Sequence, residues 1–184
     1  MIYPIVVYGN AVLRKLSKDI DPNYDNIQKI IENMWKTMYS SDGVGLAAPQ
    51  IGLAIRLFVI DGKDMAEEFP ELKNFKQTFI NARIIERSDN MERDYEGCLS
   101  LPGIREEVSR PDRIRIQYVD ADFKPHDEVY EGFAARIIQH EYDHIEGKLF
   151  IDHLSPLRKR LIKSKLNAIT VGKVNIDYKI KLPK

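Results

Sequence analysis

The sequence predicts a single α+β domain in which antiparallel or mixed β-sheets pack around one central helix. The chain has 184 residues, of which 43% are hydrophobic and 30% charged, which suits one domain with a sizeable core and is short for two. Segments with helical and strand-like periodicity do not alternate regularly, as they would in a doubly wound sheet. No internal repeat or interdomain linker interrupts the chain, so residues 1–184 are expected to form one unit.

Charge and cysteine content exclude several classes of partner. Lys plus Arg and Asp plus Glu number 28 each, whereas a groove for DNA usually carries a basic excess, so no DNA partner is expected. The first ten residues lack the basic and long apolar segments of a signal peptide, and no stretch resembles a membrane span. Cys98 is the only cysteine and forms no internal disulfide, which is typical of a cytoplasmic protein.

The N-terminal half contains one predicted helix and one predicted buried strand. Apolar residues three and four positions apart predict an amphipathic helix over 24–39. The stretch SSDGVGLAAPQIG, at 40–52, is too rich in glycine for the interior of a helix or strand and is predicted to be a loop. AIRLFVID, at 54–61, is typical of a buried strand. The polar residues at about 62–76 predict a surface insertion.

In the C-terminal half, polar and apolar residues alternate less regularly. Extended segments are predicted at 77–87, 113–120 and 128–133. A helix is expected to begin near Phe133 and to end at Gly147, a residue type that commonly follows a helix C-terminus.

Residues 155–184 are expected to form a C-terminal helix and tail. The helix covers 155–170, with Ser155 as its N-cap and Pro156 in its first turn. The tail alternates over 174–184 and predicts a final strand.

The central helix carries the sequence QHEYDH, which contains an H-E-x-x-H pattern. Residues four apart stack one turn above each other, so His140 and His144 can reach one metal ion, while Glu141 stands beside it and can take a proton from water. The alternative is a hydrogen-bonded histidine pair on a partly polar helix. Because Phe133 and Ile137 share the stripe of both histidines, the pattern favours an inward-facing metal site.

A catalytic metal centre usually has three protein ligands, so a third is needed. Downstream, Glu146 is too close on the same helix, and His153 follows His144 at a spacing that differs from H-E-x-x-H-x-x-G-x-x-H. Upstream, Cys98 lies in YEGCLSLPG. This cysteine could fill space in the core, act as a free nucleophile or bind a metal. Its position in a loop favours the metal ligand.

Three stretches taken together resemble the motifs of peptide deformylases, in the order of that family: GVGLAAPQ at 43–50, EGCLS at 96–100 and QHEYDH at 139–144. The resemblance implies an enzyme that hydrolyses the N-formyl group from the formyl-methionine of nascent bacterial peptides. It implies Cys98, His140 and His144 as metal ligands, with Fe(II) as the native metal and Zn(II), Ni(II) or Co(II) as substitutes. A thiolate with two imidazoles suits several of these metals.

The resemblance also assigns roles in catalysis. Glu141 is the general base that takes a proton from water and passes it to the departing amine. The side-chain amide of Gln50 and the backbone N–H of Leu99 form the oxyanion hole.

The substrate side of the site is assigned less directly. Gly45 and its neighbours pair with the substrate backbone, or simply allow a turn. A pocket that includes Val44, Phe133 and Ile137 suits a methionine side chain. Four further candidates complete this set: Glu96, Gly97, Arg105 and Arg136. Arg105 either contacts the substrate or forms a surface salt bridge. Arg136 either rims the pocket or is solvated. Glu96 and Asp143 are candidates to orient the loop and a ligand histidine.

Two rival functions and one further partner complete the expectations. A zinc metallopeptidase leaves EGCLS unexplained, and an inactive metal-binding module conflicts with the presence of Glu141 and Gln50. The basic run RKRLIKSK, at 158–165, suits docking on the ribosome or, equally, a solvated helix face.

Overall fold

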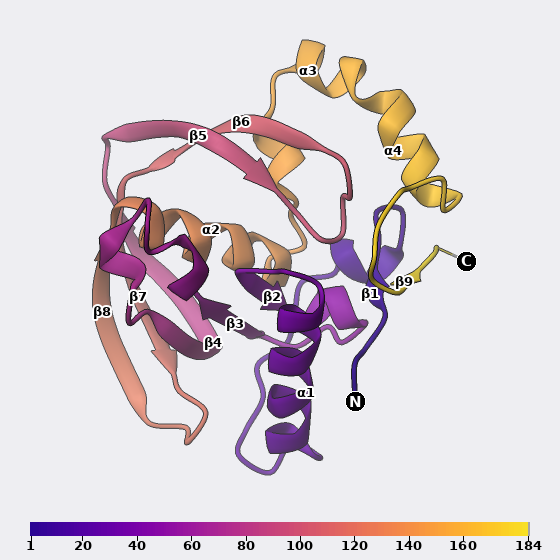
Figure 1. The fold of residues 1–184 in the computed structure, drawn as a ribbon. Helices are drawn as coiled ribbons and strands as arrows, with labels where there is room; N and C mark the ends of the chain where they lie inside the picture. Colours follow the sequence, from indigo (N-terminus) through magenta and orange to yellow (C-terminus); the bar gives the residue numbers. More distant parts are fainter. Residues whose placement is uncertain (184) are drawn as a thin grey trace.

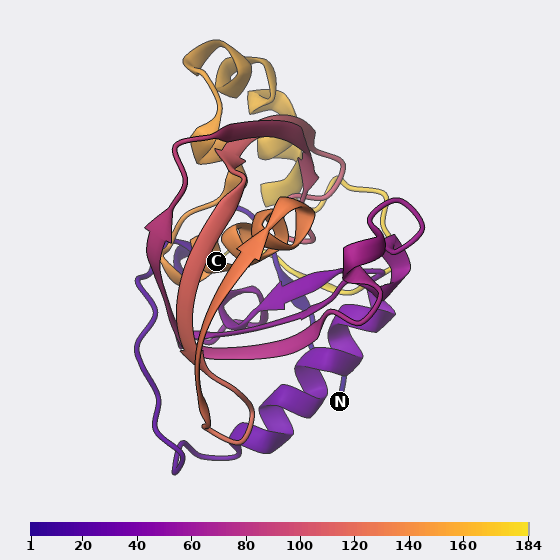
Figure 2. The ribbon, with the colours of Figure 1, turned by 90° about the vertical axis from the view of Figure 1, so that its left-hand side faces the viewer.

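The largest element of the fold is a five-stranded antiparallel sheet that curves around helix α2 (Figures 1 and 2). The computed structural model describes residues 1–183. Neighbouring strands follow the order β2, β3, β4, β7, β8. Their bounds are Gly45–Ala47, Leu57–Asp61, Lys76–Arg87, Arg113–Val119 and Pro125–Glu131. The strands predicted at 54–61, 77–87, 113–120 and 128–133 are therefore confirmed, with shifted ends.

Helix α2, Gly132–Ile145, is the central helix that the sequence predicts. It begins one residue before Phe133, and Gly147 follows its end with a φ of 71°. Ile138, Tyr142 and Ile145 are buried in a core cluster together with residues of β3, β4 and β7. The fold is α+β, as predicted, and its sheet holds α2 in place.

A two-stranded hairpin covers the other side of α2 (Figure 1). It pairs β5, Met91–Gly97, with β6, Arg105–Pro111. Neither strand is predicted from the sequence, because the pattern that marks a half-buried strand is missing. The inward positions of β6 include Glu106 and Arg110, which are charged and nevertheless buried. Ion pairs, rather than apolar burial, keep these positions inside.

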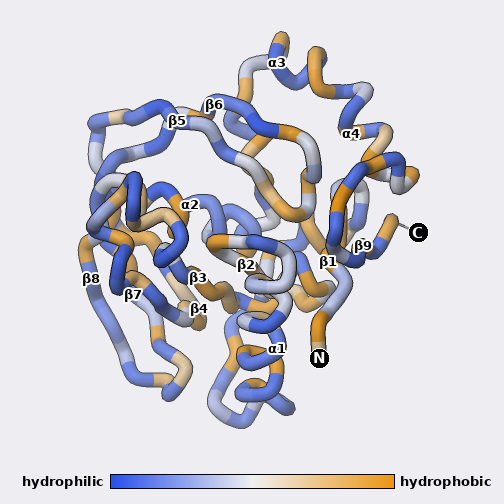
Figure 3. Tube along the Cα trace, in the orientation of Figure 1, coloured by the Kyte–Doolittle hydropathy of each residue, from blue (hydrophilic) through white to orange (hydrophobic). Residues whose placement is uncertain are grey.

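Helix α1, Ile27–Ser40, packs against the sheet through Ile31, Met34 and Met38. It starts three residues later than predicted, because Asn26 adopts a left-handed conformation with a φ of 57°. Figure 3 shows polar and apolar stretches in turn along α1, as expected where the two kinds of residue lie on opposite faces of an amphipathic helix.

The predicted loop at 40–52 is wrong in part. Residues 45–47 form β2, and Ala48–Ile51 form the 3-10 helix η2. Gly45 is tolerated inside a strand for a specific reason: a Cβ atom there would collide with the side chain of Glu141. The glycine therefore records a close approach between β2 and α2, rather than a turn.

The C-terminal region also differs from the prediction. The expected helix at 155–170 is two helices, α3 (Pro156–Leu161) and α4 (Lys163–Thr170), with the break at Ile162. The N-cap is confirmed, since the Ser155 hydroxyl accepts a hydrogen bond from the Arg158 N–H at 3.3 Å.

The predicted strand at 174–184 reduces to β9, Ile180–Lys181, which pairs in parallel with β1, Ile5–Val6 (Figure 1). Residue 184 lies outside the described residues. Two short 3-10 helices, η1 (Ala11–Arg14) and η5 (Phe150–His153), complete the connections. Within residues 1–183, no helix is both long enough and apolar enough to cross a membrane.

The segment at 62–76 contains the 3-10 helices η3, Lys63–Met65, and η4, Pro70–Leu72. Its charged residues are mostly exposed, but it also reaches the core. Leu72 is fully buried, and the ring of Phe69 stacks on that of Phe133 at 4.0 Å between centroids. The segment thus fixes the first turn of α2.

Replacing Leu72 by Ala should lower the free energy of unfolding by about 2–5 kcal/mol, because it removes a buried side chain and leaves a cavity. Chemical denaturation measures this loss. The neighbouring exposed residue gives the control, since Lys73→Ala should change stability by less than about 0.5 kcal/mol. Equal effects of the two substitutions would contradict the burial of this segment.

Candidate metal centre

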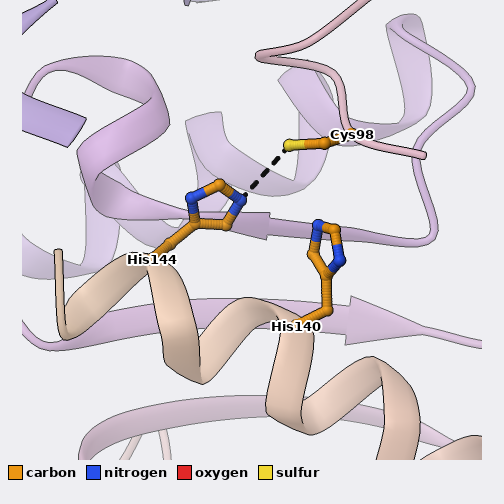
Figure 4. A group of neighbouring side chains, drawn as sticks. All are labelled: Cys98, His140 and His144. Atoms are coloured by element: carbon orange, nitrogen blue, oxygen red, sulfur yellow. Dashed lines mark hydrogen bonds between the residues drawn. The ribbon is translucent and has the colours of Figure 1, made fainter. Parts of the chain in front are cut away.

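Cys98, His140 and His144 converge on one point between α2 and the β5–β6 hairpin (Figure 4). One ligand atom from each lies within 4.8 Å of the others. The Cys98 Sγ is 3.3 Å from the His144 Nε2. The histidines lie one turn apart on α2, with ring centroids 5.3 Å apart, and the cysteine follows the end of β5. The three predicted ligands are therefore brought together by two separate elements.

The connection between β5 and β6 carries the cysteine in a tight turn. The Leu101 N–H donates to the Cys98 carbonyl at 2.9 Å, and Gly103 adopts a φ of 74°. Glycine accepts this conformation without steric cost, which explains LPG after EGCLS.

The two alternative ligands are engaged elsewhere. The Glu146 carboxylate pairs with the Arg56 guanidinium at 2.6 Å. The His153 Nε2 lies 2.8 Å from the Asp143 carboxylate. Neither belongs to the cluster of ligand atoms around Cys98, so the metallopeptidase arrangement lacks its downstream ligand here.

The thiol of Cys98 is poised to be a thiolate. Burial alone raises its pKa, but the charges and hydrogen bonds of His144 and His140 outweigh burial and lower the pKa to about 5. The thiolate is the form that binds metals. A thiolate can also act as a nucleophile, but the two imidazole nitrogens beside this one complete a set of three metal ligands.

Glu96 orients the first histidine. Its Oε2 lies 2.9 Å from the His140 Nδ1, so the His140 Nε2 is left to face the centre. This is the usual arrangement of a metal-binding histidine and its outer carboxylate. Burial would raise the pKa of Glu96, but His140 and Arg110 hold it well below its ordinary value, so the carboxylate stays ionised.

Two buried arginines complete this network. Arg110 donates to both oxygens of Glu96, at 2.6 and 2.9 Å, and Arg136 donates to its Oε1 at 2.9 Å. Arg136 is only 5% exposed and lines the cavity, so of its two alternatives the solvated side chain is excluded. Asp143 accepts from Arg110 at 2.9 Å and does not contact a ligand histidine. Arg110 was missed because a charged residue in an unrecognised strand gives no sign that it is buried.

Glu141 is buried beside the ligands. Burial raises its pKa to about 7, and within residues 1–183 its Oε2 has no hydrogen-bond partner. The Nδ1 of His144 is similarly buried without a partner in the described chain. A carboxyl group with a pKa near neutrality can accept and donate a proton at working pH. The sulfur, the two imidazoles and this carboxylate together fit a late first-row divalent metal with a base beside it.

Gln50 and Leu99 offer donors to the same space. The Gln50 Oε1 accepts from the Ala47 N–H at 2.8 Å, which turns its Nε2 toward Cys98 Sγ at 3.5 Å and Ser100 Oγ at 3.2 Å. The Leu99 N–H makes no hydrogen bond within residues 1–183. The Leu99 N–H is thus without an acceptor among the described residues, whereas the Gln50 Nε2 beside it donates to Ser100 and, at a longer distance, to Cys98.

These residues open onto a cavity of about 660 Å³. The residues assigned to catalysis, metal binding and substrate binding all line it except His144, which is buried. They include the substrate candidates Val44, Gly45, Glu96, Gly97, Arg105, Phe133, Arg136 and Ile137. Asp143, a candidate to orient a ligand, does not line it. Arg105 lies exposed and forms no ion pair with the described residues, so the predicted salt bridge is absent there.

Residues that the sequence did not assign to the site also line the cavity, among them Met65, Tyr95, Ile176 and Tyr178. The last two come from the C-terminal tail. Burial raises the pKa of Tyr178 to about 12, so its hydroxyl stays a donor. The sequence shows that polar and apolar residues alternate along the tail, but it does not show which surface of the protein the tail covers.

Comparisons with known proteins show the family of this chain. A family model described as polypeptide deformylase matches residues 2–160. The peptide deformylase of Christiangramia forsetii is 52% identical, over 100% of this chain and 97% of that protein. That of Flavobacterium johnsoniae is 51% identical, over 98% of this chain and 96% of that protein.

Solved structures agree as well. A peptide deformylase from Legionella pneumophila superposes with a TM-score of 0.81 and 35% identity, covering 94% of this chain and 98% of its own. The peptide deformylase of Thermus thermophilus superposes with a TM-score of 0.81 and 37% identity, covering 92% of this chain and 98% of its own. Given the match across nearly the whole chain, this protein belongs to the polypeptide deformylase family, metal-dependent enzymes that remove the N-formyl group from newly made polypeptides.

Proposed function

We propose that Cys98, His140 and His144 hold one divalent metal ion and that Glu141 moves the proton in deformylation. The observation that carries this proposal is the convergence of three ligand atoms within 4.8 Å beside a buried carboxylate. The products are formate and a polypeptide with a free N-terminal methionine. We further propose Fe(II) as the native metal, with Zn(II), Ni(II) or Co(II) as substitutes, since a thiolate and two imidazoles accept all four.

When bound, the cation supplies Lewis-acid chemistry, lowering the pKa of a water molecule and polarising the formyl carbonyl. The residues of the chain do the rest. Glu141 accepts a proton from the attacking water and delivers it to the departing amine nitrogen. Its pKa of about 7 suits both transfers, because neither direction then faces a large barrier near neutral pH.

Negative charge develops on the formyl oxygen during attack, and two donors await it. The Gln50 Nε2 is fixed by the hydrogen bond between its own Oε1 and the Ala47 N–H. The Leu99 N–H comes from the turn after Cys98. Preorganised donors of this kind stabilise the transition state without having to reorient.

The edge of the five-stranded sheet provides a place for the substrate backbone. β2 pairs with β3 on one side only, so its other edge is open for an extended peptide beside Gly45. Gly97 lies across the cavity, and Arg105 stands at its exposed edge. The methionine side chain would then enter the apolar pocket formed by Val44, Phe133 and Ile137.

Glu96 and Arg136 contribute differently. The Glu96 carboxylate accepts hydrogen bonds from both Arg136 and Arg110, so Glu96 and Arg136 shape the wall of the cavity rather than reach for the peptide.

Helices α3 and α4 present an exposed basic surface that includes Arg160, Lys163 and Lys165. We propose that this surface docks on ribosomal RNA in the cytoplasm, which would bring the enzyme to its N-formylmethionyl nascent peptides. Arg158 is partly engaged, because its guanidinium pairs with Glu106 at 2.6 Å.

Glu141→Ala should abolish turnover, lowering kcat by at least about 10²-fold, because it removes the general base. Bound metal should remain, since no ligand is lost. The assay is formate release from formyl-Met-Ala-Ser by anaerobically prepared enzyme, alongside metal analysis. Glu131→Ala, at an exposed glutamate just before α2, is the control and should retain activity. Full activity of Glu141→Ala would exclude this residue as the base.

Cys98→Ala should weaken metal binding by at least about 100-fold, the upper end of what even an outer-shell partner contributes. Activity should fall with metal content, whereas Cys98→Asp, which keeps an anionic ligand, should retain part of both. Elemental analysis after dialysis measures the content. Removing the metal from the unaltered enzyme with a chelator should abolish activity, and adding Fe(II), Ni(II) or Co(II) should restore it. Unchanged metal content in Cys98→Ala would refute the ligand set.

Gln50→Ala should lower kcat by about 10²- to 10³-fold with a smaller change in KM, because the lost donor acts on charge that develops during attack. Steady-state kinetics separates the two constants. The exposed Gln28 serves as the matched control. A rise in KM at constant kcat would instead mean that Gln50 binds the ground state only.

A further inference from the structure

The C-terminal tail, residues 171–183, lies outside the part of the chain that the family model matches. It leaves α4, crosses beside the cavity and ends next to β1 (Figure 1). Alternate residues are half-buried: Val174, Ile176, Tyr178 and Ile180. The residues between them are exposed. One face of an extended segment therefore packs on the body of the protein.

Tyr178 attaches this tail to the turn that carries Cys98. Its hydroxyl donates a hydrogen bond to the Leu99 carbonyl at 2.9 Å. The next carbonyl, of Ser100, accepts from the Tyr8 N–H at 2.9 Å. The turn is thus held at successive peptides, and the tail holds the one that begins at Leu99. Because the Leu99 N–H is the proposed oxyanion donor, fixing its carbonyl fixes the residue that must aim that N–H.

Ile176 lines the cavity, as do Leu99 and Tyr178. The residues of the methionine pocket, Phe133 and Val44, pack against the core cluster that includes α2, whereas Leu99 and Tyr178 pack against a different cluster. Successive side chains of an extended peptide point to opposite sides. If methionine enters the α2 pocket, the following side chain points away from α2, toward the apolar wall that the tail provides.

We propose that the C-terminal tail completes the active site: Tyr178 is a positioning residue for the Leu99 backbone, and Ile176 contacts the substrate side chain that follows methionine. This inference rests on the proposed function. It makes the tail a determinant of preference among nascent peptides, favouring an apolar residue at the second position.

The contact with Ile176 is tested by the ratio of kcat/KM for formyl-Met-Leu-Ser to that for formyl-Met-Gly-Ser. The holoenzyme should prefer leucine, and Ile176→Ala should lower this ratio by about tenfold, because it removes several apolar atoms from the wall. Asp177→Ala is the matched control, since Asp177 is exposed on the opposite face of the tail. An equal ratio in the two variants overturns the inference.

The role of Tyr178 is tested with Tyr178→Phe, which keeps the ring and removes one hydrogen bond. We expect kcat to fall by about tenfold, the typical strength of such a bond, equally for both peptides and with little change in KM. Tyr8→Phe is the control, because the Tyr8 hydroxyl makes no hydrogen bond within residues 1–183, while its N–H continues to hold Ser100. Thermal unfolding of both variants shows whether the fold is intact. Equal kcat values in these two variants also overturn the inference.

The unaltered enzyme separates this inference from the proposed function. If it releases no formate from either peptide, the proposed function fails. If it is active and the tail variants match their controls, only the role of the tail fails.

Discussion

The buried carboxylate of Glu96 joins the two halves of the site. It accepts hydrogen bonds from Arg110 on β6 and from Arg136 on α2, and it orients His140. Removing it would leave the buried Arg136 guanidinium without its carboxylate and would leave Arg110 paired with Asp143 alone. Breaking a buried ion pair typically costs about 3–5 kcal/mol. This charge is therefore one of several links between the hairpin that positions Cys98 and the helix that supplies both histidines. Arg136 also donates to the Glu92 and Val108 carbonyls, and Arg110 also pairs with Asp143. The ligand geometry depends on these links, because no chain segment connects the two elements closely.

A second constraint on the site is the contact between β2 and α2. β2 approaches α2 so closely that a Cβ atom at Gly45 would collide with the Glu141 side chain. The same contact buries Glu141, and burial raises its pKa toward neutrality. Glycine in this strand thus has a chemical consequence at the base. The packing of β2 against α2 therefore both leaves one edge of β2 open and raises the pKa of Glu141.

The parts of the site that could be read from the sequence are those whose meaning is local. Helical spacing identifies α2 and places His140 and His144 on one face, and the Ser155 cap is visible from its neighbours. What could not be read depends on contacts distant in the chain. Arg110 resembles an exposed residue until Glu96 and Asp143 surround it. Gly45 resembles a turn residue until Glu141 lies against it. Ile176 and Tyr178 belong to an alternating tail whose partner surface only the fold supplies.

The pairing of β1 with β9 has a consequence for how the cleft opens. This ladder contains two residue pairs and closes a loop of almost the whole chain, so its formation is entropically costly. The five-stranded sheet, in contrast, belongs to the cooperative core. Short ladders at the ends of a chain are the segments that open at the lowest free energy. The wall of the cleft that the tail forms is therefore the part that opens first by local unfolding. Such opening breaks the Tyr178 hydrogen bond to the Leu99 carbonyl but leaves His140, Glu141 and His144 in place on α2.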